Sequence, residues 1–525
     1  MEAGESDAAN FDVTLEKPHL DQIKNETKKL RGNKTTGKDV LPSKLFKHGV
    51  TALSEGLHMI ITKIWQEQTL SQEWIENEVR DRRICKKIDT SSSVCCTYSA
   101  TVLLNAAHRV LSGILFFRLT PIANDFKGKY RADTSTEAIF TLQQVLQKCR
   151  EFNVPTHHLF MDLSDALNTV DRDQLWQIMD EYRLPTKLTR LIKATTESLM
   201  YHEVTSNSSK PKNGLRHGCE LSRLLFIIAI EGIVRRAKVE TEGTIFQKKK
   251  VQLISFNDNM DLIARSVEEL ENTYAALKTE AKRLGLVFHS DKVKYMRATG
   301  SKNDSLASSS RISLSGDAFE VVDEYLFLDS LVTVGNDTTK EIERRILKGD
   351  GAYNEHLSTL ESTRKSNESK LKIYKTSIRP FVLGGHETWT MNAKDQTKLG
   401  EFERKVLKTI YNTSPQKDNE KKLNPANREL HALLGEASIV QKAKVDRLRW
   451  AGNVIRKPHD SPVRMVLESD PEGRRNRGRP RARWLNCVED DLEIIKDSRN
   501  VWELAKDPVK WQQLLDTANV PGTLT

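Results

Sequence analysis

The chain has 525 residues, of which 38% are hydrophobic and 29% charged, so it has the composition of a folded protein with room for two to four domains. No apolar run approaches the ~20 residues of a membrane-spanning helix, and the acidic N-terminus lacks the features of a signal peptide. A net charge of +10 favours a polyanionic partner, and six cysteines without a CxxC pair argue against a zinc knuckle or a redox dithiol. We therefore expect a reduced, intracellular protein of the nucleus, the cytoplasm or both, neither secreted nor bound to a membrane.

Apolar residues at helical spacing predict a helix from Leu20 to Leu30, followed by Gly32, and a second helix from about Leu53 to Gln66. Farther on, residues 159–162 read as a short apolar strand that ends in a carboxylate, Asp162.

A β-hairpin is predicted for residues 253–263, where two apolar runs flank a polar tip that carries Asp258. Taken alone, such an aspartate is as a rule a plain turn residue, because its side chain hydrogen-bonds its own backbone. If this hairpin and the strand ending at Asp162 lie side by side, their two carboxylates would form a site for a divalent metal ion, since Mg²⁺ prefers oxygen ligands.

Helices and strands alternate between residues 155 and 298, which favours an α/β arrangement. A serine- and asparagine-rich loop over residues 301–310 follows, and residues 338–412 read mainly as helices. A lysine- and asparagine-rich linker over residues 414–424 precedes a last helical unit.

The most basic segment of the chain is Gly473–Trp484, in which arginines alternate with Gly, Pro, Asn and Ala. One interpretation is a solvated charged loop. The other is a phosphate-binding segment whose Arg-Gly-Arg-Pro stretch suits a minor groove. Arg447, Arg449 and Trp450 would add a basic and stacking surface, whereas Trp484 is predicted to anchor a core.

Five stretches in a fixed order carry a resemblance to a known family: HHLFMDLSDALNTVDRDQL, GLRHGCELSRLLF, the hairpin, GLVFHSDKVKYM and YLFLDSLV. The chain resembles the reverse transcriptase of a non-long-terminal-repeat (LINE-type) retrotransposon, closest to the RTE-like group, from about Leu15 to the C-terminus. The stretches correspond to the family's palm motifs A to E.

The resemblance implies a right-hand polymerase fold of the α+β and α/β type, followed by a basic helical domain. Its expected segments are an N-terminal helical connector (1–78), a fingers-like part (79–154), a palm-like core (155–335), a thumb-like helical part (336–413) and a basic helical C-terminal domain (414–525). The activity it implies is RNA-directed DNA polymerisation on an RNA template and a DNA primer, with Mg²⁺ or alternatively Mn²⁺ as cofactor.

The resemblance also assigns site residues. Asp162 and Asp258 match two of the three catalytic, metal-binding aspartates, Asn259 stands at the third position, and Lys292 matches a general acid. Residues at the nucleotide are Leu167, His217 and Gly218. Expected nucleic-acid contacts are Lys86, Lys87, Arg474, Arg475, Arg477, Arg479, Arg481 and Arg483.

Several positions depart from the family pattern. Asn259 is neutral, and the loss of one negative charge beside two dications costs several kcal/mol at close range. Asp261 lies one pleat too far along the strand to replace it, at ~3.3 Å per residue. The family's fingers arginine is Ser99, its loop is shortened near residues 128–136, and Asp329 replaces a turn glycine.

We therefore expect a decayed, catalytically impaired copy. We also expect the chain to lack the endonuclease that would precede the polymerase in the family, and therefore not to nick DNA itself. Three alternatives stay open: a live enzyme that uses Asp162 and Asp258 alone, a noncatalytic RNA- or DNA-binding protein, and a translated relic without function.

Overall fold

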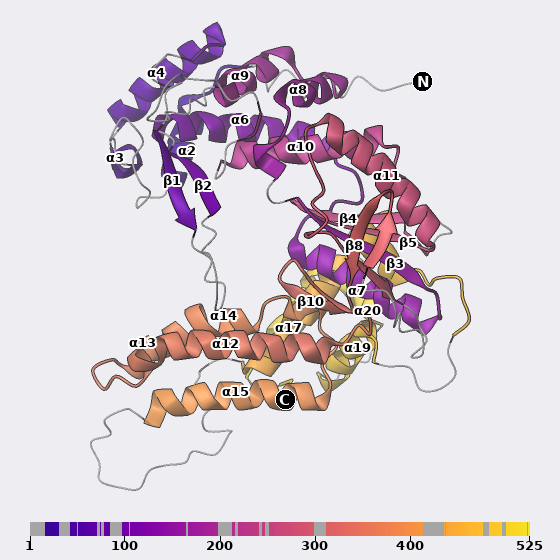
Figure 1. The fold of residues 1–525 in the computed structure, drawn as a ribbon. Helices are drawn as coiled ribbons and strands as arrows, with labels where there is room; N and C mark the ends of the chain where they lie inside the picture. The colour runs from indigo at the N-terminus through magenta and orange to yellow at the C-terminus, as the bar shows by residue number, and fades with distance from the viewer. Residues whose placement is uncertain are drawn as a thin grey trace, which may run out of the picture. The chain divides into compact units, whose positions relative to one another are not determined.

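In a computed structural model of the chain, the described residues form α-helices and β-sheets in an α+β arrangement (Figure 1). The chain divides into two compact units, Met1–Gly128 with Leu163–Val239 and Thr273–Phe288, and Lys129–Asp162 with Glu240–Asn272 and His289–Thr525. No helix in the described part of the chain is long and apolar enough to cross a membrane. The structure describes residues 16–30, 43–49, 51–70, 74, 78–84, 97–103, 106–163, 166–197, 213–215, 219–240, 244–246, 251–298, 311–412, 435, 437–475, 482–495, 500–521 and 523–524.

The first unit consists mainly of helices and one two-stranded hairpin. Both helices predicted near its N-terminus are confirmed, as α2 and α4. Helix α10 crosses α8 so closely that a Cβ on Gly232 would lie 2.6 Å from Ile178. The elements are α2 (Leu20–Lys29), α3 (Ser43–His48), α4 (Thr51–Glu67), β1 (Glu78–Ile84), β2 (Thr97–Leu103), α6 (Ala106–Asp125), η1 (Ala166–Asn168), α8 (Arg172–Glu181), α9 (Thr186–Glu197), α10 (Glu220–Arg236) and most of α11 (Val267–Arg283).

The second unit contains a six-stranded sheet in the order β4-β5-β3-β6-β8-β7. Neighbouring strands are antiparallel except β6 and β8, which are parallel. Helix α7 (Ser135–Glu151) packs on this sheet in a core that includes Phe160, Ile263 and Met296. The strands are β3 (Thr156–Asp162), β4 (Val251–Phe256), β5 (Asn259–Ala264), β6 (Lys294–Ala298), β7 (Arg311–Leu314) and β8 (Asp317–Val321), and β9 (Glu324–Phe327) pairs separately with β10 (Ser330–Thr333).

Residues 338–412 are helical, as predicted. Helices α12 and α15 lie side by side (Figure 1) and enclose a core around Trp389 and Phe402. The elements are α12 (Thr338–Leu360), α13 (Asn367–Ile373), η2 (Tyr374–Ile378), α14 (Arg379–Val382), η3 (His386–Thr388) and α15 (Ala393–Asn412).

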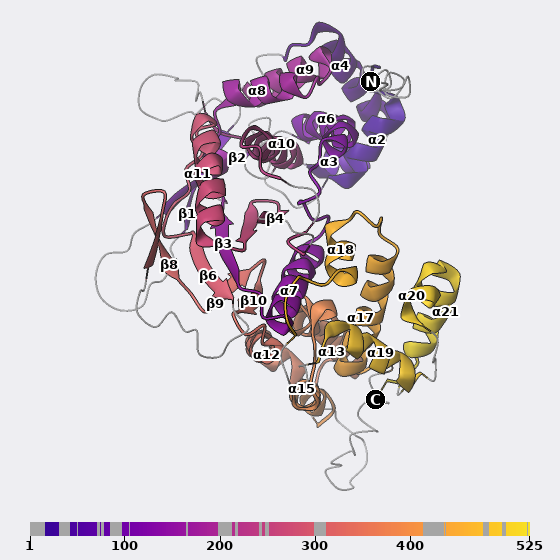
Figure 2. The ribbon, with the colours of Figure 1, turned by 90° about the vertical axis from the view of Figure 1, so that its right-hand side faces the viewer.

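The C-terminal helices gather around α17, as Figure 2 shows. Trp484 is fully buried and packs edge-to-face on Phe140 of α7, with ring centroids 4.6 Å apart, which confirms the prediction that Trp484 anchors a core. These helices therefore share their core with α7. They are α17 (Ile439–Ile455), α18 (Pro462–Glu468), α19 (Trp484–Ile494), α20 (Val501–Lys506) and α21 (Pro508–Ala518).

The prediction that Arg447 belongs to a basic surface on α17 is wrong. Arg447 is buried; its Nη2 donates to Asp491 Oδ2 at 2.6 Å and its Nη1 to the Trp389 carbonyl at 3.0 Å. Arg449 forms an ion pair with Asp446, and Trp450 packs edge-on against Phe140. Arg447 therefore joins α17 to α19, whereas Arg449 pairs within α17, because Asp446 lies on the same helix.

A second buried polar contact joins η3 to α17. The His386 Nε2 atom lies 2.8 Å from Asp446 Oδ2, and Lys442 Nζ lies 3.0 Å from the same carboxyl group. Burial disfavours the charged carboxylate, but the hydrogen bonds and charges of His386 and Lys442 outweigh it and lower the pKa of Asp446 from 3.8 to about 2.

This depressed pKa predicts an acid-sensitive contribution to stability. It is complete above the unfolded-state pKa near 4 and is lost as the pH falls through about 2. We expect the free energy of unfolding to fall by about 2 kcal/mol from this group between pH 4.5 and 2, and the Asp446→Asn variant to lack that component. Urea unfolding at several pH values measures it, with the exposed Asp516→Asn as control. Equal pH slopes in the wild type and Asp446→Asn would contradict the prediction.

Candidate active site

The hairpin predicted around Asp258 is confirmed. Strands β4 and β5 pair from Val251 with Ala264 to Phe256 with Asn259, and the two-residue turn between them is Asn257–Asp258. Asn257 adopts a left-handed conformation with φ of +54°, which asparagine tolerates better than most residues. The turn therefore holds the Asp258 side chain at the tip of the hairpin, where it is half-buried.

The strand that ends at Asp162 lies directly beside this hairpin. In the register of β3 with β5, Asp162 is the partner of Asn259, the residue that follows Asp258. Lys292 precedes β6, which borders β3 on its other side and pairs Lys294 with Phe160. The fold thus brings the motif A, C and D positions of the resemblance to one end of adjacent strands.

Asn259 is bonded to its neighbour in a way that a carboxylate could not be. Its Nδ2 atom donates to Asp258 Oδ1 at 3.1 Å. The amide therefore occupies an oxygen that would otherwise be available to a cation. Within the described residues, no group of three or more His, Cys, Asp or Glu side chains could hold a metal ion. Two carboxylates and this amide do not fit the pair of divalent ions that the resemblance implies.

Asp261 is committed to a different contact. Its side chain is fully buried, and Oδ2 lies 3.0 Å from His158 Nδ1, while His158 Nε2 lies 3.0 Å from Thr156 Oγ1. In the register Asp261 pairs with Phe160, two residues inward from the strand end. It therefore does not replace the missing third carboxylate.

Tyr325 of β9 lies near the carboxylates of Asp162 and Asp261. Its ring stacks on Phe160 with centroids 4.3 Å apart. Burial, followed by the negative charges of Asp162 and Asp261, raises the pKa of Tyr325 to about 12. At neutral pH the Tyr325 side chain is therefore a neutral phenol beside Asp162 and Asp261.

Arg131 contacts the hairpin turn, which the sequence did not predict. The stretch from Tyr130 to Ala132 bonds the edge of β4, with Ser255 N donating to Tyr130 O at 3.0 Å and Ala132 N to Ser255 O at 2.9 Å. Arg131 is 7% exposed, and its Nη2 donates to the Asn257 carbonyl at 3.3 Å. A lone arginine in a loop carries no local signal for this contact, since its partner lies 126 residues away.

Of the three residues expected at the nucleotide, the structure describes Leu167. Leu167 in η1 accepts at its carbonyl from Leu215 N at 2.7 Å, and Gly214 approaches so closely that a Cβ would lie 2.7 Å from the Asn168 carbonyl. The segment that leads into motif B thus lies against η1. His217 and Gly218 themselves lie outside the described residues.

Of the predicted nucleic-acid contacts, the structure describes Arg474, Arg475 and Arg483. Arg475 Nε lies 2.5 Å from Glu151 Oε1, and Arg483 Nε donates to Glu151 Oε2 at 2.8 Å, so one carboxylate at the end of α7 holds both ends of the arginine-rich segment. Arg474 lines an open hollow of about 370 Å³ with Arg265 and Phe152. The other predicted contacts, Lys86, Lys87, Arg477, Arg479 and Arg481, lie outside the described residues.

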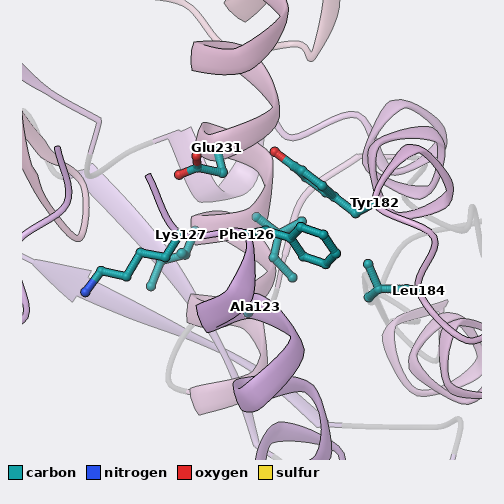
Figure 3. Close-up of a pocket in the computed structure, with 8 residues that line it drawn as sticks. Ala123, Phe126, Lys127, Tyr182, Leu184 and Glu231 are labelled. Atoms are coloured by element: carbon teal, nitrogen blue, oxygen red, sulfur yellow. The ribbon is translucent and has the colours of Figure 1, made fainter. Parts of the chain in front are cut away.

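A small enclosed pocket in the first unit does not suit a substrate. Figure 3 shows Phe126, Tyr182 and Leu184 around it, with Phe126 and Tyr182 ring centroids 4.6 Å apart. Its volume is about 10 Å³, which is the space of about one water molecule. A nucleotide cannot enter it.

Comparison with known proteins agrees with this geometry. Residues 96–345 match the family model described as reverse transcriptase (RNA-dependent DNA polymerase). The chain is also similar to an uncharacterized transposon-derived protein of Caenorhabditis elegans, at 22% identity over 268 residues that cover 49% of this chain and 92% of that protein. The matched family segment includes the carboxylate strand β3, the β4–β5 hairpin and the β9–β10 hairpin. Residues 96–345 are therefore similar to a reverse transcriptase domain.

Proposed function

We propose that the chain is a retrotransposon-derived reverse transcriptase that binds nucleic acid but polymerises DNA weakly or not at all. The observation that carries the loss of activity is the hydrogen bond from Asn259 to Asp258, at the position where the resemblance places a third metal-binding carboxylate. Extension of a DNA primer on an RNA template, in Mg²⁺ and in Mn²⁺, tests it.

The finer assignment belongs to the same proposal. The RTE-like, non-long-terminal-repeat type rests on the order of the five motifs. The β-sheet of the second unit corresponds to a palm, the β1–β2 hairpin to fingers, and α12 to α15 to a thumb. In this assignment Asp162 and Asp258 are the remaining metal ligands, Lys292 is the general acid, and Leu167, His217 and Gly218 lie at the nucleotide.

Binding without catalysis is the second part of the proposal. Phosphate contacts depend on positive charge and not on the catalytic carboxylates. The chain has an excess of ten positive charges, and the structure clamps both ends of the arginine-rich segment to Glu151. We propose that Arg477, Arg479 and Arg481, between the clamped ends, contact phosphates.

The salt dependence of binding tests this segment. Changing Arg477, Arg479 and Arg481 together to Ala is expected to lower the slope of log affinity against log salt by up to about three on duplex DNA, at about 0.9 for each lost phosphate contact. Filter binding or fluorescence anisotropy between 50 and 300 mM salt measures the slope.

A matched control removes the same charge from another place. The triple change of Lys278, Lys282 and Arg283 to Ala on α11 also deletes three positive charges. An unchanged slope in the arginine variant, or an equal drop in the control, would return the segment to a solvated loop. A·T-rich and G·C-rich duplexes then separate minor-groove contact from plain phosphate contact, because a narrow groove favours arginine.

A further inference from the structure

The turn between β9 and β10 places one carboxylate among three cations. Leu328 and Asp329 form a two-residue turn with φ of +50° and +62°, and Phe327 pairs with Ser330 across it. The adjacent face of α12 presents Arg344, Arg345 and Lys348. The half-exposed Asp329 side chain lies 3.4 Å from Arg344 Nη1, 3.1 Å from Arg345 Nη1 and 2.5 Å from Lys348 Nζ.

The two arginines are held in place independently of that carboxylate. Glu341, one turn earlier on α12, is 1% exposed and accepts from Arg344 Nε and Arg345 Nε at 2.7 Å each. Both guanidinium groups also donate to the backbone carbonyl of Asp329. Gly384 leaves space for the Arg345 guanidinium, since a Cβ there would collide with it. The cations would therefore keep their geometry without the Asp329 charge.

Charge and shape make this cluster an anion site. Three cations face two carboxylates, which leaves one net positive charge, and neutralising Asp329 would leave two. Burial works against the Asp329 charge, but the Lys348 hydrogen bond and the charges of all three cations outweigh it and lower the pKa of Asp329. Two guanidinium groups and an ammonium around one oxygen pair suit a phosphate group, because arginine binds phosphate through two parallel hydrogen bonds.

We propose that Arg344, Arg345 and Lys348 form a binding site for a nucleic-acid phosphodiester, and that Asp329 occupies this site as an internal competitor. The inference rests on the proposed nucleic-acid binding and locates one contact of it. In the resemblance a glycine stands at position 329, so the competing carboxylate is a feature of this chain. Asp329 thus weakens binding at this site, and its removal should strengthen it.

Asp329→Asn is the informative variant, because asparagine keeps the left-handed turn and removes the charge. On an RNA–DNA hybrid oligonucleotide, we expect about tenfold tighter binding at 50 mM salt and a salt slope steeper by roughly one to two contacts. Adding Lys348→Ala to this variant should reverse about one unit of the slope. Glu361→Gln is the matched control, since it removes one negative charge just past the end of the same helix, about 20 Å from Lys348.

Inorganic phosphate tests the site without nucleic acid. It should raise the melting temperature of Asp329→Asn more than that of the wild type or Glu361→Gln at equal ionic strength. ATP in place of the hybrid identifies the source of the phosphate: a gain for ATP without a gain for the hybrid would overturn the assignment to a phosphodiester.

Failure of the inference and failure of the proposed function give different results. If the wild type binds the hybrid and Asp329→Asn binds it no better than Glu361→Gln does, the site is refuted and nucleic-acid binding stands. If no variant binds the hybrid, both are refuted, whatever the response to phosphate. If Asp329→Asn gains affinity, Glu361→Gln does not, and Lys348→Ala reverses about one unit of the slope, the site is established.

Discussion

The wild-type chain is expected to extend a DNA primer on an RNA template no further than its Asp162→Ala variant does, in Mg²⁺ or in Mn²⁺. The physical reason is the state of the Asp258 carboxylate, which accepts a hydrogen bond from Asn259 and lacks a third carboxylate beside it. Asn259→Asp should restore metal-dependent product, with a gain of roughly 100-fold over the wild type, or about 3 kcal/mol of transition-state stabilisation. Full activity is not expected, because Ser99 and the shortened loop near residue 130 remain.

Asn259→Ala is the matched control for this experiment. It frees the Asp258 oxygen without adding a carboxylate, so it separates the competing hydrogen bond from the missing charge. We expect it to stay inactive. Luminescence titration with Tb³⁺ gives a second readout, in which Asn259→Asp should bind the ion more tightly than either other form. Robust extension by the wild type that disappears in Asp162→Ala would overturn the proposed impairment.

Loss of the Arg447 side chain should produce the largest change in stability. Arg447→Ala leaves Asp491 buried without its cation and removes the hydrogen bond to the Trp389 carbonyl. Breaking a buried pair from one side costs about 3–5 kcal/mol. We expect the unfolding transition followed by tryptophan fluorescence to move to markedly lower urea concentration.

Two further variants serve as controls for the loss of stability in Arg447→Ala. Arg449→Ala removes a partly exposed partner of Asp446 from the same helix and should cost no more than about 1 kcal/mol. The double variant Arg447→Met with Asp491→Leu removes both buried charges and should recover most of the loss, because an apolar pair of similar volume needs no desolvation. Equal midpoints for Arg447→Ala and Arg449→Ala would show that the buried pair contributes little.

Local patterns in the sequence predicted the parts of the site that are themselves local. The hairpin around Asp258 follows from two apolar runs and a polar tip, and its register follows from the two-residue turn. The helices between residues 338 and 412 follow from apolar spacing. The adjacency of Asp162 and the hairpin came from the motif order, because nothing local joins residues almost a hundred positions apart.

The contacts that the sequence did not predict are those whose partners are distant. Arg447 read as a surface residue because its carboxylate partner lies 44 residues later. Arg131 gave no sign that it would reach the carbonyl of Asn257. For Asp329, the sequence showed only that a carboxylate replaces a turn glycine; the structure adds three cations from α12 that stabilise this carboxylate. Charge partners of this kind depend on tertiary packing. No regular spacing of residues along the sequence indicates them.

The ion pairs of Arg475 and Arg483 with Glu151 allow the residues between the two arginines to vary in length and charge. Arg475 and Arg483 meet at one carboxylate, so the seven residues from Asn476 to Ala482 span two fixed points. The entropy of closing such a span grows with the logarithm of its length, and doubling the length costs only about 0.6 kcal/mol. Insertions, deletions and changes of charge between the two arginines can therefore accumulate without disturbing α7 or α19.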